Sequence, residues 1–250
     1  MQNSIENQVQ QKFSRYEFKY ILNNNLSKII ENEVVFFMKY DGHLDPTLDN
    51  QYLVRSLYFD NYFSSNFYEK VDGIKKRSKY RIRTYSKNRD EKIPIFLEEK
   101  GRLGSRTFKK RSSIFLEDLN FFQGYEVDKF NLNNQSNEFF NNFYYARLRK
   151  SLNPCVIVDY YRRPYINIHG LFFRLTFDSN ISASSANELF PDNNIQQWRQ
   201  CLHGYTILEV KFDRSIPPWF HRIIQAYQLN RVSISKFVLG MKDCGIAVDL

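Results

Sequence analysis

The chain has 250 residues, which is enough to bury a substantial core in one large domain or two small ones. Aromatic residues make up 17% of it, a share that favours β-rich structure. The formal net charge of +9 indicates an anionic partner. The three cysteines form no CxxC or Cys/His cluster, which argues against a zinc site and favours reduced thiols in a cytoplasmic protein.

Alternating apolar and polar residues predict a series of strands along the chain. The clearest are 15–22, 52–60, 78–85, 93–100, 106–116, 155–166, 171–178 and 206–212. Apolar residues at helical spacing predict one helix over 26–38 and another over 217–229, and a third helix is expected to end near Lys150. Residues 41–51 are expected to form a loop.

The first residues have neither the basic nor the apolar region of a signal peptide. No apolar run approaches the roughly 18 residues that a membrane-spanning helix needs. Neither an internal repeat nor a linker is evident. We therefore expect residues 1–12 to be a flexible N-terminus and residues 13–250 to form one domain.

The polar faces of the predicted strands are unusually basic. In SKYRIRTY, at residues 78–85, Lys79, Arg81 and Arg83 share one face. Similar faces recur in RYEFKY, IFLEEK, TFKKR, DYYRRPY, FRLTFD and ILEVKF. A sheet with one solvated face would also alternate, but solvated faces usually mix serine, threonine, glutamate and lysine. If instead the sheet closes into a barrel with its apolar faces under helices, the charges converge inside.

A lumen lined with cations needs an anionic ligand, because self-repulsion and desolvation of the cations would otherwise be prohibitive. Arginine matches phosphate with two parallel hydrogen bonds, and lysine adds a point charge. The carboxylates among these cations would either pair with arginine or hold a divalent cation that bridges to phosphate oxygens. The pattern therefore predicts a phosphate-binding lumen.

The ordered set of motifs RYEFKY, SLYFD, KYRIRTY, FLEEK, KKR, YYRRPY, RLTFD, ILEVKF and SISKF resembles the VTC (vacuolar transporter chaperone) polyphosphate polymerase domain, over about residues 13 to 241. That family belongs to the triphosphate tunnel metalloenzyme, or CYTH-like, superfamily. The resemblance implies an α+β fold with a closed antiparallel eight-stranded β-barrel, the triphosphate tunnel, and helices packed outside. It also implies a polyphosphate polymerase that transfers the ATP γ-phosphate to polyphosphate with Mn²⁺ or Mg²⁺.

The same resemblance assigns roles to individual residues. The catalytic cations would be Lys19, Arg81, Arg83, Lys100, Arg162, Arg174 and Lys236. Further phosphate contacts would come from Lys109, Tyr160 and Ser235, and the strand face that Arg111 shares with Lys109 adds Arg111 to the expected phosphate ligands. The metal-coordinating glutamate would be Glu209.

Two positions depart from the related patterns. Arg15 stands where the broader superfamily has glutamate, which argues against a thiamine-triphosphatase. Ser233 stands where the VTC polymerases have a lysine, so one phosphate ligand is missing from that position. Coupling of synthesis to translocation would need a separate membrane or regulatory partner, since we find no regulatory helical domain before the predicted barrel and no membrane segment after it.

Other functions stay open at this point. The enzyme alternative is a tunnel-fold triphosphatase that hydrolyses inorganic or nucleoside triphosphate. Another alternative is a non-catalytic module that binds polyphosphate or an inositol phosphate, although the presence of Glu209 favours catalysis. Glu209 could also serve only as the ion-pair partner of an arginine in the lumen. Nucleic acid is not an expected partner, because charge inside a barrel would not face a duplex and no RNP-like or helix-turn-helix signature occurs.

Overall fold

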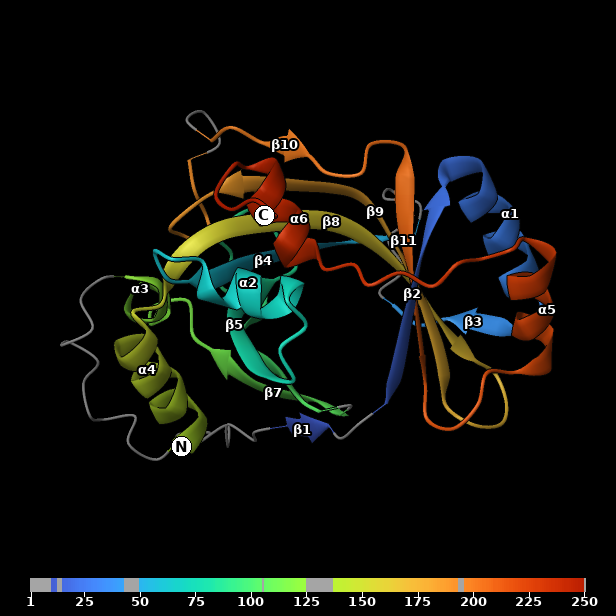
Figure 1. Cartoon of the computed structure of the whole chain (residues 1–250), viewed down its shortest axis with the longest axis horizontal. Coiled ribbons are helices and arrows are strands. Elements are labelled where there is room, and N and C mark those ends of the chain that lie inside the picture. The colour runs from blue at the N-terminus through green and yellow to red at the C-terminus, as the bar shows by residue number, and fades with distance from the viewer. Residues whose placement is uncertain are drawn as a thin grey trace.

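The computed structural model describes residues 10–12, 15–42, 50–104, 106–124, 137–192 and 196–249. In these residues one antiparallel sheet contains the strands β1 (Gln10–Lys12), β2 (Tyr16–Asn23), β3 (Met38–Tyr40), β4 (Tyr52–Asp60), β5 (Lys76–Thr84), β6 (Ile95–Leu103), β7 (Arg106–Ile114), β8 (Asn153–Asn167), β9 (Phe173–Ser185), β10 (Arg199–Gln200) and β11 (Tyr205–Phe212). The helices are α1 (Asn24–Val34), α2 (Ser65–Val71), α3 (Leu119–Gln123), α4 (Glu138–Lys150), α5 (Pro218–Ala226) and α6 (Lys236–Asp243). The fold is therefore α+β, as expected (Figure 1).

All eight predicted strands are present; their ends shift by at most three residues, except that β9 continues to Ser185, seven residues past its predicted end. The short strands β1, β3 and β10 and the helices α2, α3 and α6 were not predicted. Of the N-terminal segment expected to be flexible, residues 1–9 lie outside the described residues, and Gln10–Lys12 form β1. Most of the loop expected at 41–51 also lies outside them.

The prediction of a closed eight-stranded barrel is wrong. Among the described residues the sheet has eleven strands, and its main path runs β1-β7-β6-β5-β4-β8-β9-β11-β2 without pairing β2 to β7. The free edge of β7 pairs instead with β1, where Gln10 faces Arg111. Over Lys109–Arg111 this edge is already paired with β1 and cannot also pair with β2, so the curled sheet stays open there.

Apolar helix faces cover the outer surface of the sheet, as predicted. At one end, Phe139 and Phe143 of α4 and Phe122 of α3 pack on Leu97 and Ile157. At the other end, α1 and α5 cover the outward-facing residues of β2, β9 and β11. Figure 1 shows these two helix groups at opposite ends of the molecule.

Helix α6 differs, because it packs on the inner face of the sheet. Its residues Phe237 and Met241 contact the cluster that contains Val156 and Val158 of β8. These valines alternate with the outward Ile157, so they share a face with the charged residues further along the strand. Gly240 permits this close approach, because a Cβ there would lie 3.0 Å from a methyl group of Val158.

The inner face therefore changes character along its length. It is apolar beneath α6 and becomes charged past Val158, where Tyr160 and Arg162 follow in the same alternation. Helix α6 begins at this boundary, so its first residue, Lys236, points towards the charged part. Within the described ranges, no helix is long and apolar enough to cross a membrane.

Candidate functional site

A cavity of about 440 Å³ lies inside the curl of the sheet, and we call it the lumen cavity. All twelve predicted site residues line it: Lys19, Arg81, Arg83, Lys100, Lys109, Arg111, Tyr160, Arg162, Arg174, Glu209, Ser235 and Lys236. Twelve cationic side chains in all line this cavity, against the two carboxylates Glu17 and Glu209. The structure thus gathers the predicted residues around one space, while their individual roles stay predictions.

Glu98 of β6 organises the cations on one wall of the lumen cavity. Its side chain is 1% exposed and lies 2.6 Å from both Arg81 and Lys109, with Arg83 at 3.9 Å. Burial alone would raise the pKa of Glu98, but Arg81, Arg83 and Lys109 outweigh it and hold the pKa well below its usual range. Arg81 also donates to the Tyr58 hydroxyl at 3.0 Å, which fixes its guanidinium group further.

A second ion cluster is built from β8, β9 and α6. Arg162 makes a two-pronged pair with Asp178, through Nε at 2.6 Å and a terminal nitrogen at 2.7 Å. Lys236 of α6 lies 2.5 Å from the same carboxylate and 3.1 Å from Glu209. The Lys236 ammonium also lies 4.6 Å from the centre of the Tyr160 ring. One aspartate therefore aligns two of the predicted phosphate-binding cations.

Glu209 of β11 contacts four cations. It lies 3.1 Å from Lys236, 3.3 Å from Lys211, 3.4 Å from Arg162 and 3.6 Å from Lys19. Burial on its own would raise the pKa of Glu209, yet these cations hold it well below the usual range. In this state the carboxylate is an ion-pair partner of the lumen cations, and a role as metal ligand remains a proposal.

Glu17 bridges the open side of the sheet. It lies on β2 and pairs with Lys100 of β6 at 3.1 Å and with its strand neighbour Lys19 at 3.3 Å. Strands β2 and β6 do not pair with each other. The ion pair therefore spans the gap that backbone hydrogen bonds leave open.

The remaining predicted residues contact a partly exposed carboxylate, an aromatic ring or another lining side chain. Arg174 pairs with Asp41 at 2.8 Å, and the Arg111 guanidinium lies 4.1 Å from the centre of the Phe96 ring. The Tyr160 hydroxyl accepts from Arg83 at 3.2 Å. Ser235 Oγ accepts from the Lys79 ammonium at 3.1 Å.

Lys79 lines the lumen cavity but was not among the predicted site residues. Its partners are the Ser235 hydroxyl and the face of Phe237 at 4.8 Å, and no described carboxylate lies within ion-pair distance of it. Burial lowers the pKa of Lys79 well below its usual range, and neighbouring cations add to the shift. The sequence signal that could have identified Lys79 as a site residue was its position two residues before Arg81, because this spacing places both side chains on one face of the strand.

Lys109 is a cation of the lumen cavity whose charge can change near neutral pH. Burial lowers its pKa and Glu98 opposes that shift, while Arg81 and Arg83 add to the lowering; together they bring the pKa of Lys109 to about 7. A bound anion would raise this pKa again. Ligand binding is therefore expected to depend on pH near neutrality.

The carboxylates that could hold a divalent metal ion are few. In the described ranges, no three His, Cys, Asp or Glu side chains form a metal-binding group. The lining carboxylates are Glu17 and Glu209, and Lys19 contacts both. Mg²⁺ commonly uses only one or two protein carboxylates when substrate phosphates supply other ligands. The donor set thus fits a metal ion that enters together with a phosphate ligand.

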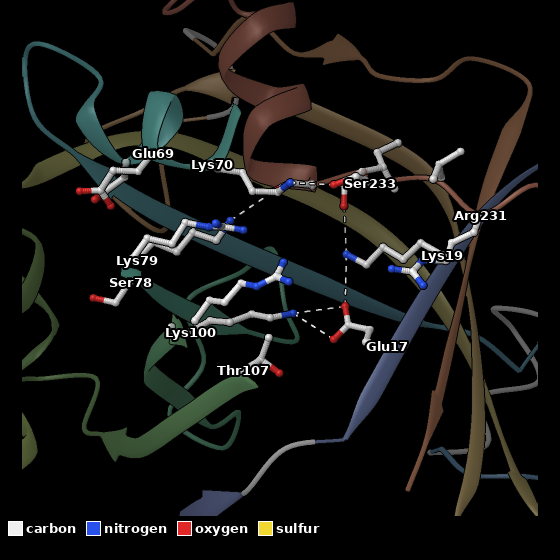
Figure 2. Close-up of a pocket in the computed structure, with 17 residues that line it drawn as sticks. Glu17, Lys19, Glu69, Lys70, Ser78, Lys79, Lys100, Thr107, Arg231 and Ser233 are labelled. Atoms are coloured by element: carbon white, nitrogen blue, oxygen red, sulfur yellow. Dashed lines mark hydrogen bonds and ion pairs between the residues drawn. The ribbon is translucent and has the colours of Figure 1, made fainter. Parts of the chain in front are cut away.

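A second cavity of about 440 Å³ adjoins the first, and we call it the outer cavity (Figure 2). The two share Glu17, Lys19, Lys79, Lys100, Thr107 and Ser235. Residues found only in the outer cavity include Lys70 of α2, Arg77 of β5 and Arg102 of β6. The charged lining therefore continues beyond the residues that the sequence predicted.

Comparison with known proteins places this arrangement in a family. Residues 14–244 match the VTC domain. No sequence among the curated proteins matches the chain. Among solved structures, it is similar to protein bh2851 of Bacillus halodurans, whose name assigns it provisionally to the adenylate cyclases; the TM-score is 0.50 at 12% identity, over 89% of this chain and 93% of that one.

Two further structures share less of the geometry. PH1819 of Pyrococcus horikoshii OT3 has a TM-score of 0.46 at 13% identity, over 91% of this chain and 97% of that one. A mimivirus capping enzyme triphosphatase has a TM-score of 0.32 at 12% identity, over 87% and 89% of the two chains. The family match spans nearly the whole chain and agrees with the motif order and the lumen lining, so this protein belongs to the VTC domain family.

Proposed function

We propose that this chain is a polyphosphate polymerase domain, which transfers the γ-phosphoryl group of ATP to a growing polyphosphate. The observation that carries the proposal is the continuity of two cationic cavities through shared residues such as Lys79 and Lys100. A triphosphatase needs room for one triphosphate, whereas a polymerase must also hold the product chain. A basic lining that extends past the lumen cavity supports the second requirement.

The chemistry in the lumen cavity would be positional and electrostatic. Arg81, Arg83 and Arg162 are held in fixed orientations by Glu98 and Asp178, so they can bind phosphate oxygens without first being ordered. None of the described lining residues is histidine or cysteine. The phosphoryl group would therefore pass directly from ATP to the terminal oxygen of the acceptor chain, with the lumen cations holding both in line.

The carboxylates that pair with the lumen cations would also affect ligand binding. When a phosphate chain enters, it competes with Glu98, Asp178 and Glu209 for the same cations. Glu209 would then be free to hold Mn²⁺ or Mg²⁺, with Glu17 nearby. When bound, such an ion would withdraw charge from the β- and γ-phosphate oxygens.

The direct test is purified protein incubated with ATP and Mn²⁺, with ADP and polyphosphate both measured. We expect ADP to be released together with polymer. Release of ADP and free phosphate without polymer would replace the proposal with a triphosphatase. Tight binding of tripolyphosphate without any ADP release would replace it with a binding module.

A further inference from the structure

The outer cavity has an excess of positive charge that the structure does not neutralise. Its cationic side chains are Lys19, Lys70, Arg77, Lys79, Lys100, Arg102 and Arg231. It has two carboxylates, of which Glu17 pairs with Lys100 and Glu69 pairs with Lys150, a residue outside the cavity, at 3.1 Å. Lys70, Arg77 and Arg102 have no described carboxylate within ion-pair distance. An anion is therefore the natural ligand of this space.

Lys70 reaches this cavity from α2, and its position is well fixed. The buried carboxylate of Asp60, at the end of β4, accepts from the backbone N–H groups of Asn66 and Phe67 at 2.9 and 3.0 Å. Phe67 is fully buried in the cluster that also contains Phe237. These contacts hold the helix against the sheet, so the Lys70 side chain extends over the cavity (Figure 2).

The Lys70 ammonium donates to the hydroxyl of Ser233 at 3.0 Å, across a sequence separation of 163 residues. Ser233 is the position at which the resemblance led us to expect a lysine. The structure thus brings a cation to this place from a different element. Burial lowers the pKa of Lys70 and the nearby cations Arg77 and Lys19 lower it further, as expected for an ammonium group that lacks an anionic partner.

We propose that the outer cavity binds phosphoryl groups of a chain that extends out of the lumen cavity, with Lys70 as the cation next to Ser233. This rests on the proposed function, because it takes the lumen ligand to be a phosphate chain. Lys70 does not line the lumen cavity, so a triphosphate confined there does not touch it. Lys70 therefore distinguishes long chains from short ones.

The test is equilibrium binding without metal or turnover, measured by calorimetry with tripolyphosphate and with long-chain polyphosphate. Lys70→Gln should weaken long-chain binding by about tenfold, the size expected for one charge-assisted hydrogen bond, and change tripolyphosphate binding by less than about twofold. Lys28→Gln is the matched control, since Lys28 is exposed on α1 and lines neither cavity. Adding Ser233→Lys to Lys70→Gln should restore long-chain affinity.

Two results would overturn the proposal. One is an equal loss of affinity for both ligands, or no loss for either, in a Lys70→Gln protein that unfolds at the wild-type temperature. The other result is that inositol hexakisphosphate, a separate ligand of the same chemistry, binds beside saturating tripolyphosphate and requires Lys70, while long-chain affinity does not depend on Lys70. The binding assay is independent of ATP turnover, so the subsite and the polymerase activity can fail separately.

Discussion

Glu98 offers the sharpest test of how the lumen is held together. Its carboxylate is 1% exposed and contacts three cations, so Glu98→Gln would leave Arg81, Arg83 and Lys109 without their main counter-ion. Removing one partner of a buried ion pair costs about 3–5 kcal/mol. The Lys109 side chain is 38% exposed and is partly solvated, so we expect the lower value, about 3 kcal/mol. For a chain of this length that corresponds to a fall in Tm of about 6–12 °C.

A phosphate ligand should reverse this loss. Tripolyphosphate supplies the negative charge that the variant lacks, and ligand at about 100 times its Kd stabilises the folded state by about 2.7 kcal/mol. We therefore expect tripolyphosphate to bind Glu98→Gln more tightly than wild type and to raise its Tm by more. The assay is thermal unfolding at several ligand concentrations, with both proteins at the same pH and salt.

Glu99 provides a matched control on the same strand. It points to the opposite face, and burial raises its pKa, so its neutral form is already favoured relative to an ordinary glutamate. Glu99→Gln should lower the free energy of unfolding by less than about 1 kcal/mol and leave the ligand response unchanged. The reasoning is refuted if Glu98→Gln is as stable as wild type, or if tripolyphosphate raises the Tm of Glu98→Gln and of wild type equally.

The remaining predictions concern single charges in the lumen cavity. Lys79→Met should raise the Tm of the free protein and weaken tripolyphosphate binding, because a buried cation without a carboxylate is removed; a fall in Tm with unchanged binding would contradict it. Glu209→Gln should lower Mn²⁺-dependent ATP turnover by about 100-fold or more while metal-free tripolyphosphate binding persists or tightens, and full turnover with a normal Mn²⁺ titration would exclude a metal role. Since the pKa of Lys109 is about 7 in the free protein and rises beside an anion, tripolyphosphate binding should take up a proton and weaken between about pH 6 and about pH 8. Calorimetry in buffers of different ionisation enthalpy would measure this uptake, which Lys109→Arg should reduce; an unchanged uptake in this variant would contradict the role of Lys109.

The sequence predicted the lining of the site better than the shape around it. Side chains alternate along a strand, so the residue spacing alone placed Arg81 with Arg83 and Tyr160 with Arg162 on one face. Closure of the sheet depends on which edges exchange hydrogen bonds, and alternation carries no information about that. The pairing of β1 with β7 therefore could not be foreseen.

The missed helices have a different cause. Helices α2 and α6 have seven and eight residues, lengths at which tertiary packing rather than local sequence decides whether a helix forms. Val156 and Val158 fitted the strand pattern, but nothing in that pattern said that α6 would cover them. For the same reason Lys70 was not predicted as a site residue, since its place beside Ser233 depends on the packing of α2.

The lumen combines two opposite requirements, and its carboxylates reconcile them. Cations that bind a phosphate chain must face one another in a space sheltered from water, where their repulsion opposes folding. Glu98 and Asp178 reduce that repulsion and hold the cations in place before a ligand arrives. They do not cancel the charge, because the lining cations greatly outnumber the carboxylates. The remaining positive charge is what an anionic chain would neutralise, so the excess that weakens the empty fold also supplies the affinity for phosphate.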